Sequence, residues 1–493
     1  MKQLLTITIC LIALISFSQT TSLSVMESKE FKDDVKSNKI LALHTTEIGV
    51  TAVVRDSKKN LLFDLFDKDL NKTYSKLIEI SKKESYLGDL FYGDELKLFT
   101  LFKENKFDRK IACHVFNLKD KTHKKIELFS ATVDKNQALF SGSSKRETGF
   151  ALSPDGGSLV IATDNIKKNS NSYTVRVFNA NTLELEYKKS YQESTEKFFE
   201  PNDIAIDNSK NVYVVGKLFL EGKAKKKKDK ANYKFILNKI SESKVDNLEI
   251  KLETEFISSL NINRSDQLKL YGFYSDKRDG RIKGGCSFVI DENTLNVINK
   301  NKNVLPKSVY DDLYGYRKAN KKEGKELSSF YLDHILEDNQ GNSYLIAEEF
   351  YITTQYVSNG AGGGYWTTVY HYNDILILKF TSKGNLEWGR SIFKRSTSPS
   401  YNVFLKNDEL HVILNSGKNL TEKKDGRTKV SKGWFESSAL YDFAYDVLGE
   451  VSYNKIQDNK GKTFYLPFYG AYQGDRYIMV SSGRKKKQFM SLQ

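Results

Sequence analysis

The chain has 493 residues, with 39% hydrophobic and 12% aromatic side chains and a formal net charge of +15. This is enough apolar material for a large core, which excludes disorder across the body of the chain. The positive charge comes mainly from lysine, whereas sequence-specific readers of nucleic acid rely on arginine, so we expect no nucleic-acid partner.

The first 18 residues have the features of a secretory signal peptide. Lys2 is followed by an apolar stretch over residues 4–17, and small residues precede a cleavage point at Gln19. The alternative, a membrane anchor, is disfavoured because the stretch is short and lacks a basic flank. No later segment has some 18 apolar residues in a row, so we expect no transmembrane segment in the mature chain. The prediction is an exported protein, either in the periplasm, where it could associate with the outer membrane, or outside the cell.

A strand–turn–strand pattern recurs along the chain. The segment NDIAIDNSKNVYVVG (202–216) aligns with LDHILEDNQGNSYLIAE (332–348), which places Asp207 on Asp338 and Asn211 on Asn342. FALSPDGGSLVIAT (150–163) is a third copy, and weaker copies cover residues 87–100, 258–273, 402–415 and 468–482. Each copy predicts two strands joined by a tight turn of Asp, Asn, Gly and Ser.

Two further strands follow most copies, and repeated units of four antiparallel strands are typical of a β-propeller. The fold class is therefore all-β, with one propeller domain over residues 39–493 and eight blades favoured over seven. The units start near Asn38, Ser85, Thr148, Pro201, Phe256, Phe330, Tyr401 and Thr463. The last unit lacks an outer strand, which the N-terminal segment 19–38 could supply to close the ring. A pair of all-β sandwich domains is the structural alternative.

Three charged segments interrupt the regular spacing. Residues 222–233 predict a basic hairpin tip, residues 307–329 a short helix on a blade connection, and residues 417–434 a charged loop. Such charge runs usually form solvated tips. Cys113 and Cys286 lie in distant repeats, so buried free thiols are favoured over a disulfide.

Motifs for catalysis, cofactors or metal ions are lacking in the sequence. There is no G-x-S-x-G elbow, and the six histidines show no metal-binding spacing. We therefore expect no enzyme activity, no catalytic residue, no cofactor and no metal. The alternative is a carbohydrate-active hydrolase or lyase working in the propeller funnel, for which Glu348, Glu349 and Asp374 are candidates by position only. Glu348 and Glu349 are adjacent on a strand and should face opposite ways.

Several turns resemble those of known propeller families. SPDGG (153–157) resembles the S-P-D-G turn of WD- and TolB-like propellers and half of a sialidase Asp-box, although Val160 stands where that box has tryptophan. TSKGNLEW (381–388) resembles a pyrroloquinoline-quinone-type repeat, in which the tryptophan docks between blades. As a whole, the chain resembles uncharacterised secreted propellers of Bacteroidota. The resemblance implies a fold and no activity.

The most unusual stretch is TTQYVSNGAGGGYWTTVYHYNDILILKF (353–380), with four glycines in five positions. It lacks the lysine of a phosphate-binding loop and is followed by a strand, so it predicts a long hairpin loop from about Gln355 to about Tyr370. Exposed aromatic side chains on such a loop are typical of contact sites. The candidate partner-contact residues are Tyr356, Tyr365, Trp366, Tyr370 and Tyr372, unless they pack on a neighbouring blade.

These features favour a binding or scaffold propeller. The expected partner is another protein of the cell envelope, such as an outer-membrane transporter or a secretion translocon. The basic surface also suits an anionic glycan or lipopolysaccharide.

Overall fold

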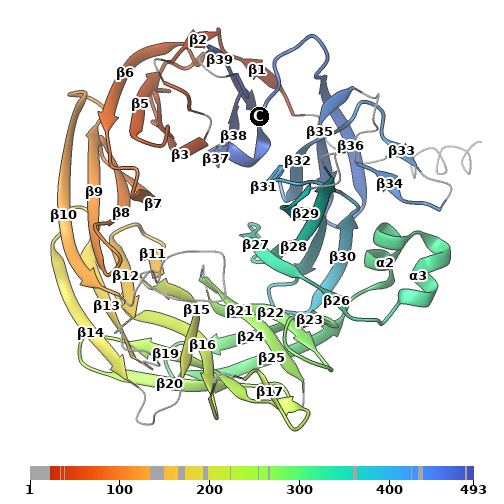
Figure 1. Ribbon diagram of the computed structural model, residues 1–493. Coiled ribbons are helices and arrows are strands. Elements are labelled where there is room, and N and C mark those ends of the chain that lie inside the picture. Colours follow the sequence, from red (N-terminus) through yellow and green to blue (C-terminus); the bar gives the residue numbers. More distant parts are fainter. Residues whose placement is uncertain are drawn as a thin grey trace, which may run out of the picture.

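The chain forms a ring of eight four-stranded antiparallel sheets, which confirms the predicted eight-bladed β-propeller (Figure 1). The computed structural model describes residues 23–33, 35–37, 39–133, 149–164, 172–192, 198–222, 224–253, 255–264, 267–358, 364–422, 425–430, 437–483 and 486–493. The predicted signal peptide lies outside the described residues.

The first four blades follow one another along the chain, each with its first strand nearest the ring axis. Blade one consists of β3 (Lys39–Thr45), β4 (Thr51–Asp56), β5 (Asn60–Phe66) and β6 (Lys72–Glu79). Blade two consists of β7 (Glu84–Tyr92), β8 (Glu95–Lys103), β9 (Asp108–Asn117) and β10 (Thr122–Thr132). Blade three consists of β11 (Gly149–Leu152), β12 (Ser158–Asp164), β13 (Ser172–Asn179) and β14 (Leu185–Gln192). Blade four consists of β15 (Phe199–Ile206), β16 (Val212–Phe219), β19 (Tyr233–Ile240) and β20 (Val245–Ile250).

The second half of the ring continues the same order. Blade five consists of β21 (Phe256–Arg264), β22 (Leu268–Ser275), β24 (Gly284–Asp291) and β25 (Asn296–Val304). Blade six consists of β27 (Phe330–Glu337), β28 (Ser343–Ser358), β29 (Gly364–Phe380) and β30 (Leu386–Ile392). Blade seven consists of β31 (Tyr401–Lys406), β32 (Glu409–Gly417), β35 (Ser438–Tyr445) and β36 (Val451–Asp458). Blade eight consists of β37 (Ala471–Gln473), β38 (Arg476–Val480), β40 (Phe489–Leu492) and β1 (Val25–Glu27).

Short elements fill the connections between these strands. Four two-stranded pairs are β2 (Phe31–Lys32) with β39 (Lys486–Lys487), β17 (Lys226–Lys227) with β18 (Lys230–Ala231), β23 (Arg281–Ile282) with β26 (Leu327–Ser328), and β33 (Thr421–Glu422) with β34 (Thr428–Lys429). The connection from blade five to blade six contains two helices, α2 (Lys307–Tyr314) and α3 (Tyr316–Lys322), where the sequence predicted one.

The predicted start of the last blade was wrong by eight residues. Its first strand begins at Ala471 rather than near Thr463. A 3₁₀ helix (Pro467–Tyr469) and an isolated bridge between Tyr465 and Ser481 occupy the intervening segment. Proline at the start of this turn favours its helical geometry over a strand.

The ring is closed by a strand from the opposite end of the chain. β1 forms the outer strand of blade eight and pairs antiparallel with β40, with Met26 opposite Ser491. The next residues are held against blade one, because the buried Arg55 donates hydrogen bonds to Asp33 Oδ1 and Oδ2 at 2.9 and 2.6 Å. The N-terminal segment therefore ties the last blade to the first.

Hydrophobic packing joins each blade to its neighbours. The buried apolar residues of the described chain fall into eight clusters, and each combines side chains from two adjacent blades. Trp388 shows this between blades six and seven, where its indole donates a hydrogen bond to the Val447 carbonyl at 3.0 Å. The tryptophan of the TSKGNLEW turn thus lies between blades, as the resemblance implied.

The repeated turn motif has a common hydrogen-bond pattern. Asp207 Oδ1 accepts a bond from Asn211 N at 2.7 Å, and Asp338 Oδ1 accepts one from Asn342 N at 2.9 Å. In both turns the asparagine amide also donates to the second carboxylate oxygen, at 2.8 and 3.0 Å. The spacing that these two copies share therefore closes the turn between the first two strands of a blade.

Candidate functional site

One face of the ring carries the enlarged connections. In a four-stranded antiparallel blade, the link between strands two and three lies on the same face as the link to the next blade. The link between strands two and three is extended in four blades: by β17–β18 in blade four, by β23 in blade five, by a long hairpin in blade six and by β33–β34 in blade seven. The link from blade five to blade six is extended by α2 and α3. The tight Asp–Asn turns lie on the opposite face. The first face is therefore where the chain departs from the repeat.

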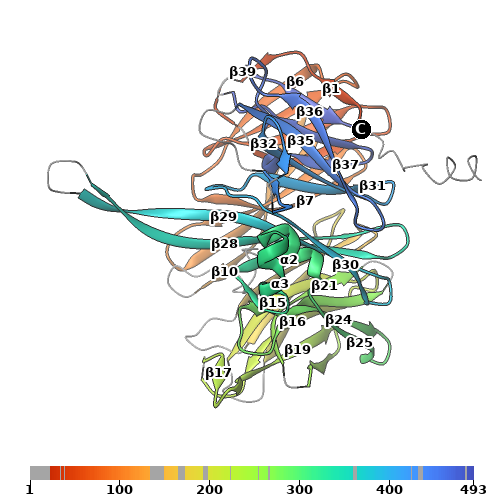
Figure 2. The same ribbon diagram turned by 90° about the vertical axis from the view of Figure 1, so that its right-hand side faces the viewer.

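The largest departure is the hairpin of blade six, here called the ribbon (residues 351–358 and 364–371). It leaves the body roughly along the ring axis (Figure 2). Pairing continues from Tyr351 opposite His371 out to Ser358 opposite Gly364, which is eight residue pairs and roughly 25 Å of strand. The predicted hairpin in blade six is present, but its predicted long loop from about Gln355 to about Tyr370 was wrong, because the strands stay paired out to Ser358 and Gly364. The Thr, Val, Tyr and Trp residues around the glycines favour strands, and these extend much further than the glycine cluster indicated.

The described base of the ribbon is stabilised by cross-strand pairs of side chains. The Tyr351 and His371 rings stack with centroids 4.4 Å apart, and the Phe350 and Tyr372 rings lie 4.9 Å apart. Asn373 Nδ2 donates a hydrogen bond to the Tyr351 hydroxyl at 3.0 Å. Such pairs are the usual source of hairpin stability outside a packed sheet.

Apolar groups on the ribbon remain in solvent. Ile352 and Tyr370 are opposite each other and are 54% and 48% exposed. Tyr372, nearer the body, is partly buried. Tyr356, Tyr365 and Trp366 occupy paired positions towards the tip, but their side chains lie outside the described residues. Two of the five predicted contact residues can thus be placed, one exposed and one partly buried.

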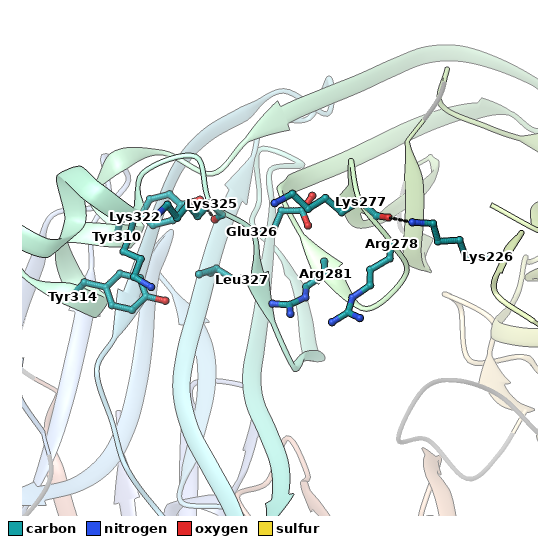
Figure 3. Close-up of a pocket in the computed structure, with 10 residues that line it drawn as sticks. All are labelled: Lys226, Lys277, Arg278, Arg281, Tyr310, Tyr314, Lys322, Lys325, Glu326 and Leu327. Atoms are coloured by element: carbon teal, nitrogen blue, oxygen red, sulfur yellow. Dashed lines mark hydrogen bonds between the residues drawn. The ribbon is translucent and has the colours of Figure 1, made fainter. Parts of the chain in front are cut away.

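The enlarged connections of blades four and five and the helices α2 and α3 enclose a basic cavity of about 530 Å³ (Figure 3). Its walls come from the β17–β18 hairpin, the β22–β23 loop, and the α2–α3 connection with its return to β26. Six cationic side chains line it, namely Lys226, Lys277, Arg278, Arg281, Lys322 and Lys325. The other lining residues are Tyr310, Tyr314, Glu326 and Leu327. Sequence reasoning treated the lysine-rich segments as separate solvated tips and missed this convergence, because the contributing segments are far apart in the chain.

A second cavity, of about 300 Å³, lies beside the first strands of blades four, five and six and contains Glu200 and Asp279. Lys217 and Lys225 donate to the two oxygens of Asp279 at 2.9 and 2.7 Å. Burial raises the pKa of Asp279, but these two cations outweigh it, so the net effect is a lowered pKa. Asp279 is therefore held as a carboxylate and is a poor general acid.

The three carboxylates predicted as catalytic candidates do come together, in blade six. The buried Glu348 accepts a hydrogen bond from Lys394 at 2.7 Å. Arg395 NH1 lies 3.4 Å from Glu349 and 3.3 Å from Asp374. Burial raises the pKa of Asp374 to about 7. However, each carboxylate has a cationic partner, and neither of the two cavities above is lined by any of them.

A row of buried and partly buried polar groups in blade two had no signal in the sequence. His114 Nε2 lies 2.8 Å from Glu84 Oε1, and His114 Nδ1 lies 3.0 Å from His123 Nε2. Burial opposes ionisation of Glu84, but the bonds from His114, Thr100 and Lys125 prevail and lower its pKa to about 2. Within the described residues, no group of three or more His, Cys, Asp or Glu side chains could hold a metal ion. Glu84, His114 and His123 thus form a polar network across three strands of blade two.

Comparisons with known proteins support the propeller fold and give no information on function. No family model matches the sequence, and no curated protein matches it. Among solved structures, a prolyl endopeptidase is 11% identical over 91% of this chain, with a TM-score of 0.42. This chain covers 55% of that enzyme, so it spans about half of its length. The WD40 domain of SCAP from fission yeast is 8% identical over 95% of this chain and 98% of its own, with a TM-score of 0.40.

A polysaccharide lyase is also similar, at 8% identity over 92% of this chain and 89% of its own, with a TM-score of 0.40. Propellers of enzymes and of binding domains thus resemble this chain about equally, and at such scores none of them carries a functional argument. In the described part of the chain, no helix is long and apolar enough to cross a membrane.

Proposed function

We propose that the protein is a non-enzymatic binding propeller that holds a protein partner through the ribbon. The observation that carries this is the ribbon itself, which leaves the ring and keeps Ile352 and Tyr370 in solvent. A two-stranded hairpin is marginally stable in water unless something packs against it. Among the described residues, each strand of the ribbon pairs only with the other, so both outer edges offer unpaired backbone groups to a partner.

The partner we propose is a protein of the cell envelope, such as an outer-membrane transporter or a secretion translocon. The support is the signal-peptide-like start of the sequence, which indicates export. A rigid ring suits this role, because binding residues are often displayed on extensions of a stable scaffold.

The test uses the tagged full chain, expressed in its own host and cross-linked in living cells. The variant is Ile352→Ser with Tyr370→Ser, and a second variant is Tyr365→Ala with Trp366→Ala at the tip. The matched control is Ile298→Ser on β25, because Ile298 is 62% exposed but lies away from the ribbon. We expect the same envelope protein to be cross-linked to wild type and control, and its yield to fall at least tenfold in both ribbon variants. An unchanged yield in both ribbon variants would contradict the proposal.

The alternative, a carbohydrate-active hydrolase or lyase, is favoured only by the presence of Glu200 and Asp279 in one cavity. The ion pairs of Asp279 with Lys217 and Lys225 argue against acid–base work there. Release of reducing ends or unsaturated sugars from acidic oligosaccharides would support this alternative.

A further inference from the structure

We propose that the basic cavity is a binding site for an acidic oligosaccharide, one that carries carboxylate or sulfate groups beside free hydroxyls. This site is separate from the ribbon and does not depend on the protein partner proposed above. It is formed only in the folded ring, because its walls come from blade four, blade five and the connection to blade six.

The charge of the cavity selects an anion. Five of its six cations, Lys277, Arg278, Arg281, Lys322 and Lys325, have no carboxylate within ion-pair distance among the described residues. The sixth, Lys226, lies 2.9 Å from Asp229, a residue that is itself strongly exposed. Like charges gathered around one concave surface repel one another and raise the local concentration of anions. Arg278 from the β22–β23 loop and Arg281 from the start of β23 point the same way (Figure 3), and arginine suits carboxylate and sulfate groups through its paired donors.

Glu326 distinguishes this site from a simple anion trap. Its Oε1 accepts hydrogen bonds from the Ser275 hydroxyl at 3.0 Å and from Asp276 N at 2.8 Å. Its Oε2 is buried and accepts no hydrogen bond from any described residue. An unpaired buried acceptor is costly, so a ligand hydroxyl that reached Oε2 after a small shift of the Glu326 side chain would be stabilising there. A carboxylate at this point disfavours any anionic group directly beside it, whereas it can accept a hydrogen bond from a sugar hydroxyl. A ligand that carries hydroxyl groups beside its anionic groups therefore fits the site better than a phosphate does.

The uncharged part of the lining suits a sugar ring. Tyr310 is buried and fixed, since its hydroxyl donates to the Lys325 carbonyl at 2.9 Å. Tyr314 lies beside it with Lys322 Nζ 5.6 Å from its ring centroid. Leu327 is buried like Tyr310, so the partly exposed Tyr314 is the aromatic side chain that a sugar ring can contact. Aromatic and apolar walls with a few polar groups are the usual lining of small-molecule sites.

The size and shape of the cavity favour an oligosaccharide over nucleic acid. About 530 Å³ lies in the usual range for sites that hold one small ligand. A nucleic-acid site would need a longer basic track along the backbone, with bases stacked on exposed aromatic side chains. Here the cations surround one hollow instead of following a groove.

The test is calorimetric titration of the full chain with four probes at 50 and 200 mM NaCl. The probes are a galacturonate trimer, a heparin-derived tetrasaccharide, the neutral cellotriose and inorganic tripolyphosphate. The first two separate a carboxylate ligand from a sulfated one. We expect at least one of these acidic sugars to bind at least tenfold more tightly than tripolyphosphate, with no binding of cellotriose.

Two variants locate the site and test its chemistry. The double variant Arg278→Ser with Arg281→Ser should bind the acidic sugar at least tenfold more weakly than wild type. The matched control, Lys188→Ser with Lys300→Ser, removes the same charge from exposed strand positions outside the cavity and should change affinity less than twofold. Glu326→Gln keeps the bonds to Ser275 and Asp276 possible but alters the acceptor. This variant should bind the acidic sugar several-fold more weakly than wild type and bind tripolyphosphate more tightly.

Three outcomes would overturn the proposal. One is no binding of either acidic sugar. The second is tripolyphosphate binding at least as tightly as the sugars. The third is that Glu326→Gln strengthens the binding of every anionic probe to the same extent, which would show that the site attracts anions by charge alone.

Discussion

Asp374 is a buried carboxyl group whose protonation should make the stability of the fold depend on pH. Its side chain is 9% exposed, and burial raises its pKa from 3.8 to about 7 against the opposing charge of Arg395. In the unfolded chain the group ionises near pH 4. Between about pH 4 and pH 7 the folded state therefore binds more protons than the unfolded state, and the contribution of Asp374 to stability falls as the pH rises.

Asp374→Asn tests this sign. The amide oxygen can still accept the hydrogen bond from Lys394 N, but it carries no charge at any pH. At pH 8 we expect the unfolding free energy of the variant to be about 2 to 4 kcal/mol higher than that of wild type, so the variant is the more stable protein. The two proteins should be nearly equal at pH 4. Urea unfolding at both pH values measures the difference, and a difference that is the same at pH 4 and pH 8 would contradict the raised pKa.

At the scale of single elements, the sequence predicted the strands well because the turns between them are specific. Asp207 and Asn211 close one turn through their own side chains, so the spacing of these residues marks the turn directly. The length of the ribbon strands was not predicted, because its glycines indicated a long loop. Cross-strand pairs such as Ile352 with Tyr370 extend the strands, and no local feature of the sequence reveals such pairs.

The basic cavity could not have been predicted from the sequence. Lys226 and Lys325 are separated by about 100 residues, and only the curvature of the ring brings their segments together. The same holds for the network of Glu84, His114 and His123, which joins three strands of one blade. Sites of this kind depend on tertiary packing, and periodicity within one segment carries no information about them.

The ring-closing strand β1 leads to a second prediction at this scale. Ser24 and Gln493 exchange two backbone hydrogen bonds at 2.7 and 3.0 Å, and Ser28 N donates to the Phe489 carbonyl at 2.9 Å. A chain that starts at residue 31 loses these bonds, and we expect its unfolding free energy to fall by roughly 3 to 5 kcal/mol. In hydrogen exchange, β40 should lose protection while β16 keeps it.

The matched control for this truncation is a chain that starts at residue 23, which retains β1. It should protect β40 as the full chain does. Equal protection of β40 in the two truncated chains would show that β1 contributes nothing to closure.

For the whole molecule, the important feature is that each hydrophobic cluster is shared by two blades. In an open repeat array the end units have one neighbour and fray first. Here blade eight packs on blade one as well as on blade seven, so every blade has two neighbours. Opening any one blade therefore disrupts two clusters, and we expect the ring to unfold as one cooperative unit.

The two cysteines of the propeller can report on this, because they lie in separate parts of the ring. Cys113 is on β9 between blades two and three, and Cys286 is on β24 between blades four and five; both are fully buried. Burial raises the pKa of Cys113 to about 12 and also raises that of Cys286, so neither thiol should react in the folded protein. In urea near the midpoint, alkylation followed by peptide mapping should label both at rates within about twofold, since both become accessible in the same global opening. Labelling of one cysteine more than tenfold faster than the other would show instead that blades open separately, and that closure of the ring does not make its unfolding cooperative.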